Sequence, residues 1–161
     1  MKPRSIAFVI AGAVLALDQL TKWWVVANLP GDPRQLIGDF LTLRYVRNPG
    51  GAFSLFPDSG VFLAIAAVGA TIFIVVVVGK TDRVAEGVAL GLVLGGAVGN
   101  LTDRVFRGDG FLDGAVVDFV DFDFFPAFNV ADSAITIGAG LALLLAFLVG
   151  REESRSAHAG G

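Results

Sequence analysis

The sequence predicts an integral membrane protein that is mainly α-helical and crosses the bilayer four times. Of its 161 residues, 55% are hydrophobic and only 17% are charged, whereas soluble domains carry more charge on their surface. A chain of this length forms one compact domain. Four apolar stretches have about the length of roughly 20 residues that crosses a hydrocarbon core of about 30 Å. They cover residues 5–29, 60–79, 84–101 and 130–150.

The first apolar stretch also resembles a secretory signal peptide, because Lys2 and Arg4 precede its hydrophobic run. The hydrophobic pattern resumes after Lys22 with two tryptophans and two valines, where a cleaved signal peptide would end at small residues. We therefore expect a retained helix. Asp18 and Lys22 share one face of it, so we expect either a supporting ion pair or a direct role near a functional site.

The distribution of basic residues predicts that both termini are cytoplasmic. Four spans place the termini and the short loop after residue 79 on one side, where six Lys and Arg residues lie close to helix ends. The two longer segments on the other side, 30–59 and 102–130, hold five over a greater length. The higher density of positive charge marks the cytoplasmic side, so these two segments are expected to be extracytoplasmic. The polar tail, residues 151–161, is expected to be disordered.

Two local patterns concern packing more than chemistry. Between residues 41 and 46, apolar and polar residues alternate, which predicts a strand, and Asn48-Pro49-Gly50-Gly51 predicts the turn that ends it. In the third apolar stretch, glycines recur every four residues and line one helical face, which lets a neighbouring backbone approach closely. These glycines are Gly87, Gly91, Gly95 and Gly99.

The composition excludes several kinds of chemistry. The net charge of −3 gives no indication of nucleic acid binding. The chain has no cysteine, which excludes disulfides, thiolate metal sites and a cysteine nucleophile, and its one histidine, His158, lies in the tail. No metal or cofactor is expected. Hydrolytic chemistry in this chain would therefore have to be supplied by carboxylates.

Five aspartates near the predicted outer surface are candidates for such chemistry. Two carboxylates close together in a desolvated site share a proton, which leaves one base and one acid. Asn129 and Asp132 resemble the capping box of the fourth helix, although Asp132 also begins a membrane span. Spacing alone does not choose among the candidates, and calcium binding by the acidic run stays an alternative. The candidates are Asp103, Asp118, Asp121, Asp123 and Asp132.

Five ordered motifs resemble those of the bacterial lipoprotein signal peptidases (signal peptidase II), and together they cover nearly the whole chain. The segments Val116–Phe119 and Phe128–Ser133 are similar to the two blocks that carry the family's catalytic pair. Gly51 stands where alanine is usual in the second motif. The first three motifs are Asp18–Lys22, Asn48–Ser54 and Gly95–Arg104.

This resemblance implies a monomeric aspartic endopeptidase of the bacterial cytoplasmic (inner) membrane, with a small extracytoplasmic β-cradle beside four transmembrane helices. Its substrate would be a prolipoprotein in the membrane lipid, cut before the diacylglyceryl-modified cysteine, and the cyclic peptide globomycin would inhibit it. Asp118 and Asp132 would be catalytic. The residues expected to bind substrate or support the site are Asp18, Lys22, Asn48, Asn100, Arg104 and Asn129.

Two other classes of function are compatible with a small membrane protein. A proton-coupled transporter or channel subunit could use Asp18 and Lys22, but the chain lacks the paired halves and broken helices that are common in transporters. A membrane scaffold could pack against a partner through the glycine face of the third helix. Substitution of Asp118 and Asp132 by Asn distinguishes the three classes, because only a peptidase depends on both.

Overall fold

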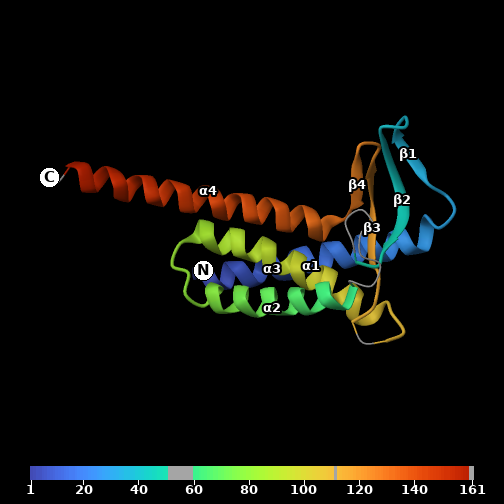
Figure 1. Cartoon of the computed structure of the whole chain (residues 1–161), viewed down its shortest axis with the longest axis horizontal. Helices are drawn as coiled ribbons and strands as arrows, with labels where there is room; N and C mark the ends of the chain where they lie inside the picture. The colour runs from blue at the N-terminus through green and yellow to red at the C-terminus, as the bar shows by residue number, and fades with distance from the viewer. Residues whose placement is uncertain (51–59, 111, 160–161) are drawn as a thin grey trace.

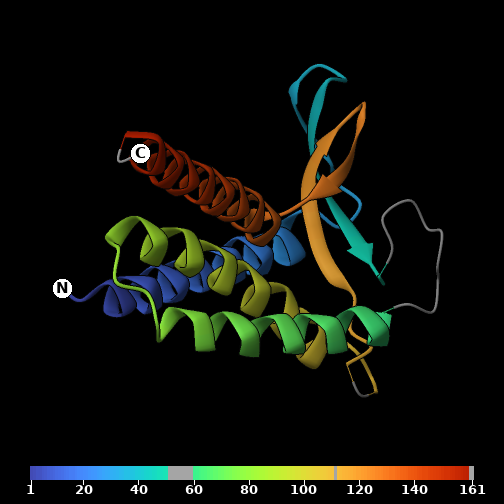
Figure 2. The ribbon, with the colours of Figure 1, turned by 60° about the vertical axis from the view of Figure 1, so that its left-hand side comes forward.

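The computed structural model describes residues 1–50, 60–110 and 112–159, which form a bundle of four helices and a small sheet. The helices lie side by side, and the sheet lies at one end of the bundle (Figure 1). Both termini lie at the opposite end, as a second view confirms (Figure 2). The helices are α1 (Pro3–Asn28), α2 (Gly60–Val78), α3 (Val84–Phe106) and α4 (Val130–Ala159).

Within the described residues, three helices are long and apolar enough to cross a membrane, namely α1, α3 and α4. Helix α2 is apolar over Ala64–Val78. Large hydrophobic side chains such as Phe62, Phe73 and Leu143 point outward and are more than half exposed on the isolated chain. Contiguous apolar surface of this kind is unusual on a soluble monomer and is what lipid covers in a membrane. The predicted fold class, a mainly α-helical membrane protein, is therefore confirmed.

The glycine face of α3 is covered by α1. A Cβ added at Gly91 would lie 2.6 Å from the carbonyl oxygen of Ala7, and one at Gly95 would lie 2.7 Å from that of Ala11. The absence of side chains at these positions therefore sets the close α1–α3 contact. Because the glycines already face a helix of the same chain, this face offers nothing to a partner, which argues against the scaffold interpretation.

The sheet has four antiparallel strands in the order β1-β2-β3-β4. Strand β2 ends at Asn48, as the turn motif predicts, and Gly50 follows with a φ of 140°. The rest of that motif, residues 51–54, lies outside the described residues. In the β2–β3 register, Asn48 lies opposite Val116, and Val46 lies opposite Asp118. The strands are β1 (Arg34–Ile37), β2 (Leu41–Asn48), β3 (Val116–Phe122) and β4 (Phe125–Phe128).

Two helices extend beyond the ends that the sequence predicts. Helix α3 continues past residue 101 to Phe106, because Asp103 and Arg104 are buried against the rest of the molecule and do not face water. Helix α4 continues to Ala159, through residues for which disorder is predicted. Residues 151–159 include two Arg, two Glu and two Ala, which favour helix, although the charged residues make this segment too polar to lie in a bilayer.

A small hydrophobic core joins the sheet to the bundle. Val25 and Leu29 from the end of α1 pack against Val117 and Phe119 of β3. These side chains are at most 8% exposed. Since Asp118 lies between Val117 and Phe119 in the strand, this core holds Asp118 at a fixed position relative to the helices.

Candidate functional site

Asp118 and Asp132 line the same cavity, where the sheet meets the bundle. The cavity has a volume of about 720 Å³ and is also lined by Asn48 from β2. Asp118 comes from β3, and Asp132 from the first turn of α4. Most of the remaining wall is apolar and is formed by β4 and α4, including Phe124, Phe125, Pro126, Ala127, Phe128 and Ile137.

Asn129 connects the two carboxylates. Its side-chain Nδ2 donates to Asp118 Oδ1 at 2.7 Å, and its backbone N donates to Asp132 Oδ2 at 3.2 Å. The Asn129 side chain is fully buried. Asp132 N donates in return to Asn129 Oδ1 at 2.9 Å, so the capping box is confirmed. Asp132 is therefore both a helix-capping residue and part of the cavity wall.

Each carboxylate also accepts a hydrogen bond from a second asparagine. Asn48 Nδ2 donates to Asp118 Oδ2 at 3.0 Å. Asn100 Nδ2, from α3, donates to Asp132 Oδ1 at 2.7 Å. The two acids are thus held from four elements, β2, β3, α3 and α4, and both keep their orientation toward the cavity. Such amide donors stabilise a carboxylate without supplying a positive charge that would keep it permanently ionised.

Burial raises the pKa of Asp118 to about 6, well above the ordinary value of 3.8. The hydrogen bond from Asn48 opposes this rise, and the negative charge of Asp132 adds to it. Asp118 is only 2% exposed. A carboxyl group with a pKa near 6 can gain and lose a proton close to neutral pH, which general acid–base catalysis requires.

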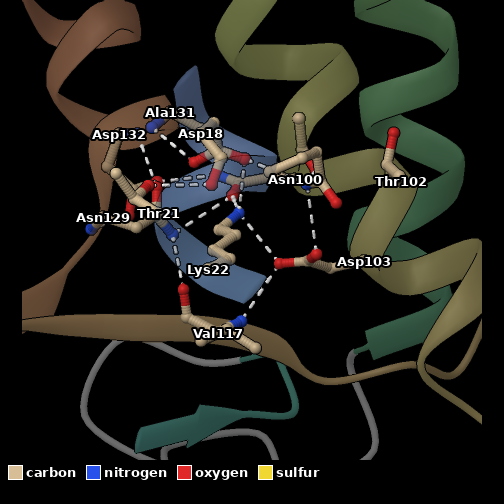
Figure 3. A network of polar contacts seen from close by, with 12 residues as sticks. Asp18, Thr21, Lys22, Asn100, Thr102, Asp103, Val117, Asn129, Ala131 and Asp132 are labelled. Atoms are coloured by element: carbon tan, nitrogen blue, oxygen red, sulfur yellow. Dashed lines mark hydrogen bonds and ion pairs between the residues drawn. The ribbon is translucent and has the colours of Figure 1, made fainter. Parts of the chain in front are cut away.

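Asp18 and Lys22 form a buried ion pair beside the two asparagines, and Figure 3 shows it as part of a larger network. Lys22 Nζ lies 2.9 Å from Asp18 Oδ2 and 2.8 Å from Asp103 Oδ2, and it donates to Asn100 Oδ1 at 2.9 Å. Neither Asp18 nor Lys22 reaches the cavity wall. The sequence left two roles open for this pair, support of the site or a direct role near it. The contacts favour support.

Arg104 is buried near the same cluster. Its guanidinium is close enough to Asp103, Asp118 and Asp132 for their charges to act on it. Within the described part of the chain, no acceptor lies within hydrogen-bonding distance of its Nη1 atom. A buried donor without an acceptor is costly in a folded protein, and Arg104 is not among the residues that line the cavity.

The other candidate acids have different surroundings. Asp103 is fully buried and pairs with Lys22 and Arg107. Asp121 does not line the cavity and pairs with Arg44 at 2.6 Å. Asp123 is exposed in the turn after β3. Only Asp118 and Asp132, among the five candidates, line the cavity.

The sequence interpretation missed the role of Gln19. Its Nε2 donates to Asp18 Oδ2 at 3.1 Å, to the carbonyl oxygen of Gly99 at 3.1 Å and to Asp103 Oδ1 at 3.3 Å. Gln19 thereby joins α1 to α3 next to the ion pair. The available signal was its polarity within an apolar span, because polar side chains at membrane depth usually face protein partners.

Comparison with known proteins gives a consistent result. The profile of the signal peptidase (SPase) II family matches residues 10–148. The lipoprotein signal peptidase of Rhodococcus jostii (strain RHA1) is 53% identical over 151 residues, which cover 92% of this chain and 75% of that protein. That of Shouchella clausii (strain KSM-K16) is 43% identical over 155 residues, covering 93% and 98%.

Solved structures with a similar fold are also membrane enzymes. One bacterial membrane enzyme superimposes with a TM-score of 0.78 at 32% identity, covering 91% of this chain and 90% of that one. A second superimposes with a TM-score of 0.74 at 34% identity, covering 86% and 90%. The helix bundle with its small sheet is therefore an arrangement already seen in enzymes of bacterial membranes.

Proposed function

The chain belongs to the signal peptidase II family, and we propose that it is an aspartic endopeptidase in which Asp118 and Asp132 cut prolipoproteins. The cut removes the signal peptide just before the diacylglyceryl-modified cysteine. The observation that carries the assignment is the position of these two carboxylates on one cavity, with Asn129 bonded to both. Paired carboxylates hydrolyse peptides without metal, histidine or cysteine.

The proposed reaction begins with one proton shared between the two aspartates. The ionised carboxylate takes a proton from a water molecule, and the water oxygen attacks the scissile carbonyl carbon. The protonated carboxyl donates to the carbonyl oxygen as negative charge develops there. When the intermediate collapses, the C–N bond breaks and the leaving amine takes a proton from an aspartate. The pKa of Asp118, near 6, suits either role.

The remaining polar groups of the site suit the binding of an extended peptide. Arg104 lies off the cavity wall but close enough to both carboxylates for its charge to act on them. Asn48 would keep Asp118 oriented while substrate enters from the cavity. The phenylalanines of β4 provide an apolar wall for the hydrophobic signal peptide and the acyl chains, and globomycin would occupy the same space. No cofactor has a part in this reaction.

The test uses purified protein in detergent with a diacylglyceryl-modified prolipoprotein peptide. We expect Asp118→Asn and Asp132→Asn each to lower kcat by about 10³-fold, since each removes a group that must move a proton. Asp121→Asn is the matched control, because it removes the same charge from the same strand but lies off the cavity. It should retain wild-type kcat. Mass spectrometry should find products cut on the N-terminal side of the lipidated cysteine.

Retained folding must accompany the loss of cleavage. The two inactive variants should unfold at a temperature close to that of the wild type, and both should still bind globomycin. If Asp118→Asn and Asp132→Asn still cleave at rates within about tenfold of the wild type, the proposed dyad is wrong. If Asp121→Asn is as inactive as Asp118→Asn, the acid has been wrongly chosen within β3.

A further inference from the structure

The ammonium group of Lys22 makes three contacts, which is its full complement of donors. It contacts Asp18 Oδ2 at 2.9 Å, Asp103 Oδ2 at 2.8 Å and Asn100 Oδ1 at 2.9 Å. Lys22, Asp18 and Asp103 are fully buried. Two of these partners lie on α3 and one lies on α1, at the level where the sheet meets the bundle (Figure 3).

Both acids held by Lys22 also bind backbone directly before a proposed catalytic aspartate. Asp103 Oδ2 accepts a hydrogen bond from the N–H of Val117, the residue before Asp118, at 3.1 Å. Asp18 Oδ1 accepts one from the N–H of Ala131, the residue before Asp132, at 3.0 Å. The two acids therefore hold β3 and the start of α4 at equivalent positions.

The third partner of Lys22 reaches the dyad by its side chain. Asn100 accepts from Lys22 through Oδ1, and this fixes its amide so that Nδ2 points to Asp132 Oδ1 at 2.7 Å. Asn129 Nδ2 also donates to Asn100 Oδ1, at 3.2 Å. Each of the three partners of the ammonium group therefore bonds either to one of the two aspartates or to the backbone N–H directly before one.

A cluster of this kind could in principle serve stability alone. Buried ion pairs are weak contributors to stability, because the cost of desolvation offsets most of the attraction. They do fix geometry, since each charged group accepts few arrangements. Here the fixed geometry is that of two segments from distant parts of the chain, which each carry one aspartate.

We propose that Lys22 is the positioning residue of this site and that its ammonium group, through Asp18, Asp103 and Asn100, sets the separation and orientation of Asp118 and Asp132. The inference rests on the proposed catalytic role of those two aspartates. Lys22 has a second effect, because its positive charge opposes the rise in the pKa of Asp118. The other charged groups that act together with Asp118 are Asp132 of α4 and Arg104 of α3.

The first test removes the cluster's central ion pair without leaving an unbalanced charge. In Lys22→Met/Asp18→Asn, we expect kcat to fall about 100-fold, with KM within about threefold of the wild type, because the reacting groups are displaced while the cavity remains. The limb of the pH–rate profile that reports Asp118 should move to higher pH, because Lys22, and not Asp18, lowers the pKa of Asp118. A purely structural role would not move that limb.

The second test separates geometry from charge. Lys22→Arg keeps the positive charge, but a planar guanidinium cannot direct its donors to three acceptors gathered around one nitrogen. We expect kcat to fall about tenfold or more while the limb of the pH–rate profile that reports Asp118 stays in place. The matched control is Arg44→Met/Asp121→Asn, which removes an ion pair that also holds β3 but lies on the sheet surface. It should retain wild-type kcat and pH profile.

A wild-type kcat in Lys22→Arg would overturn the proposal. So would a Lys22→Met/Asp18→Asn variant that folds and has a kcat within threefold of the wild type. A pH–rate profile with neither limb moved in the double variant would contradict the effect of the Lys22 charge on Asp118. If the double variant does not fold, Lys22→Arg decides the question alone. Failure of the proposed function is recognised separately, because Asp118→Asn and Asp132→Asn would then stay active.

Discussion

Asn129 has more contacts in the site than either aspartate. Its side chain caps α4 through Oδ1, and its Nδ2 lies within hydrogen-bonding distance of Asp118, Asn100 and the carbonyl oxygen of Val117. Asparagine suits this position because it carries an acceptor and two donors on one rigid amide. An aspartate would retain the cap but bring a third negative charge next to Asp118. A serine would retain the cap and lose the bond to Asp118.

At the residue scale, the raised pKa of Asp118 has a consequence for stability. Between pH 4 and 6 the folded protein binds a proton at Asp118 that the unfolded chain has already released, so the free energy of unfolding falls as pH rises through this window. The loss is fully developed above about pH 7 and amounts to at most about 3 kcal/mol. Asp118→Asn has no such loss. Its thermal midpoint, compared with that of the wild type, should therefore be relatively higher at pH 8 than at pH 4.

This comparison is made by thermal unfolding in detergent at both pH values. An Asp118→Asn variant whose stability relative to the wild type is the same at pH 4 and pH 8 would contradict the raised pKa.

At the element scale, α3 is the centre of the molecule. It packs against α1, α2 and α4, and its C-terminal end supplies Asn100, Asp103 and Arg104 to the site. The glycine face decides how close α1 can approach, and therefore whether Lys22 reaches Asp103. The last glycine of the stripe, Gly99, lies directly beside Asp18, where a Cβ would be 2.7 Å from Oδ2.

Gly95→Ala should destabilise the bundle, because its Cβ would lie 2.7 Å from both the Ala11 oxygen and the Val14 Cβ. Such overpacking typically costs about 1–3 kcal/mol. Gly12→Ala in α1 is the matched control, since nothing lies within 4 Å of an added Cβ there. We expect a lower midpoint of thermal unfolding for Gly95→Ala and an unchanged or higher one for Gly12→Ala. Equal midpoints for the two variants would show that α1 and α3 are not in tight contact.

At the scale of the whole molecule, the sheet and the two termini lie at opposite ends of the bundle (Figure 1). With four spans in the inner membrane, this arrangement would place the cavity near the extracytoplasmic surface and both termini in the cytoplasm. The natural chain has no cysteine, so single cysteines report location without interference. Exposed positions are available at both ends, Gln35 in β1 and Ser154 near the end of α4.

In intact cells, a membrane-impermeant maleimide should label Gln35→Cys and leave Ser154→Cys unlabelled. After the membrane is permeabilised, both variants should react. Labelling of Ser154→Cys in intact cells would overturn the proposed orientation, and equal labelling of both would show that the termini and the sheet lie on the same side.

Local patterns in the sequence were sufficient for the membrane class, the strand that ends at Asn48 and the capping box of Asn129 and Asp132. Each of these depends on residues within a few positions of one another, where hydrophobic periodicity and hydrogen-bonding side chains act directly. The apolar span of residues 84–101 does not by itself give the end of α3, because burial of Asp103 and Arg104, not their polarity, decides where that helix stops.

The partner of Asp132 on the cavity could be chosen only with the tertiary structure or with the family motif. Spacing alone does not choose among Asp103, Asp118, Asp121 and Asp123, which are all carboxylates in the predicted extracytoplasmic segment. The packing of β3 on Val25 and Leu29 turns Asp118 into the cavity, while Lys22 and Arg44 neutralise Asp103 and Asp121. By itself the sequence determined that carboxylates carry any hydrolytic chemistry of this chain. Contacts between segments far apart in the chain decided which pair shares a cavity, because long-range packing and strand register leave no short-range pattern.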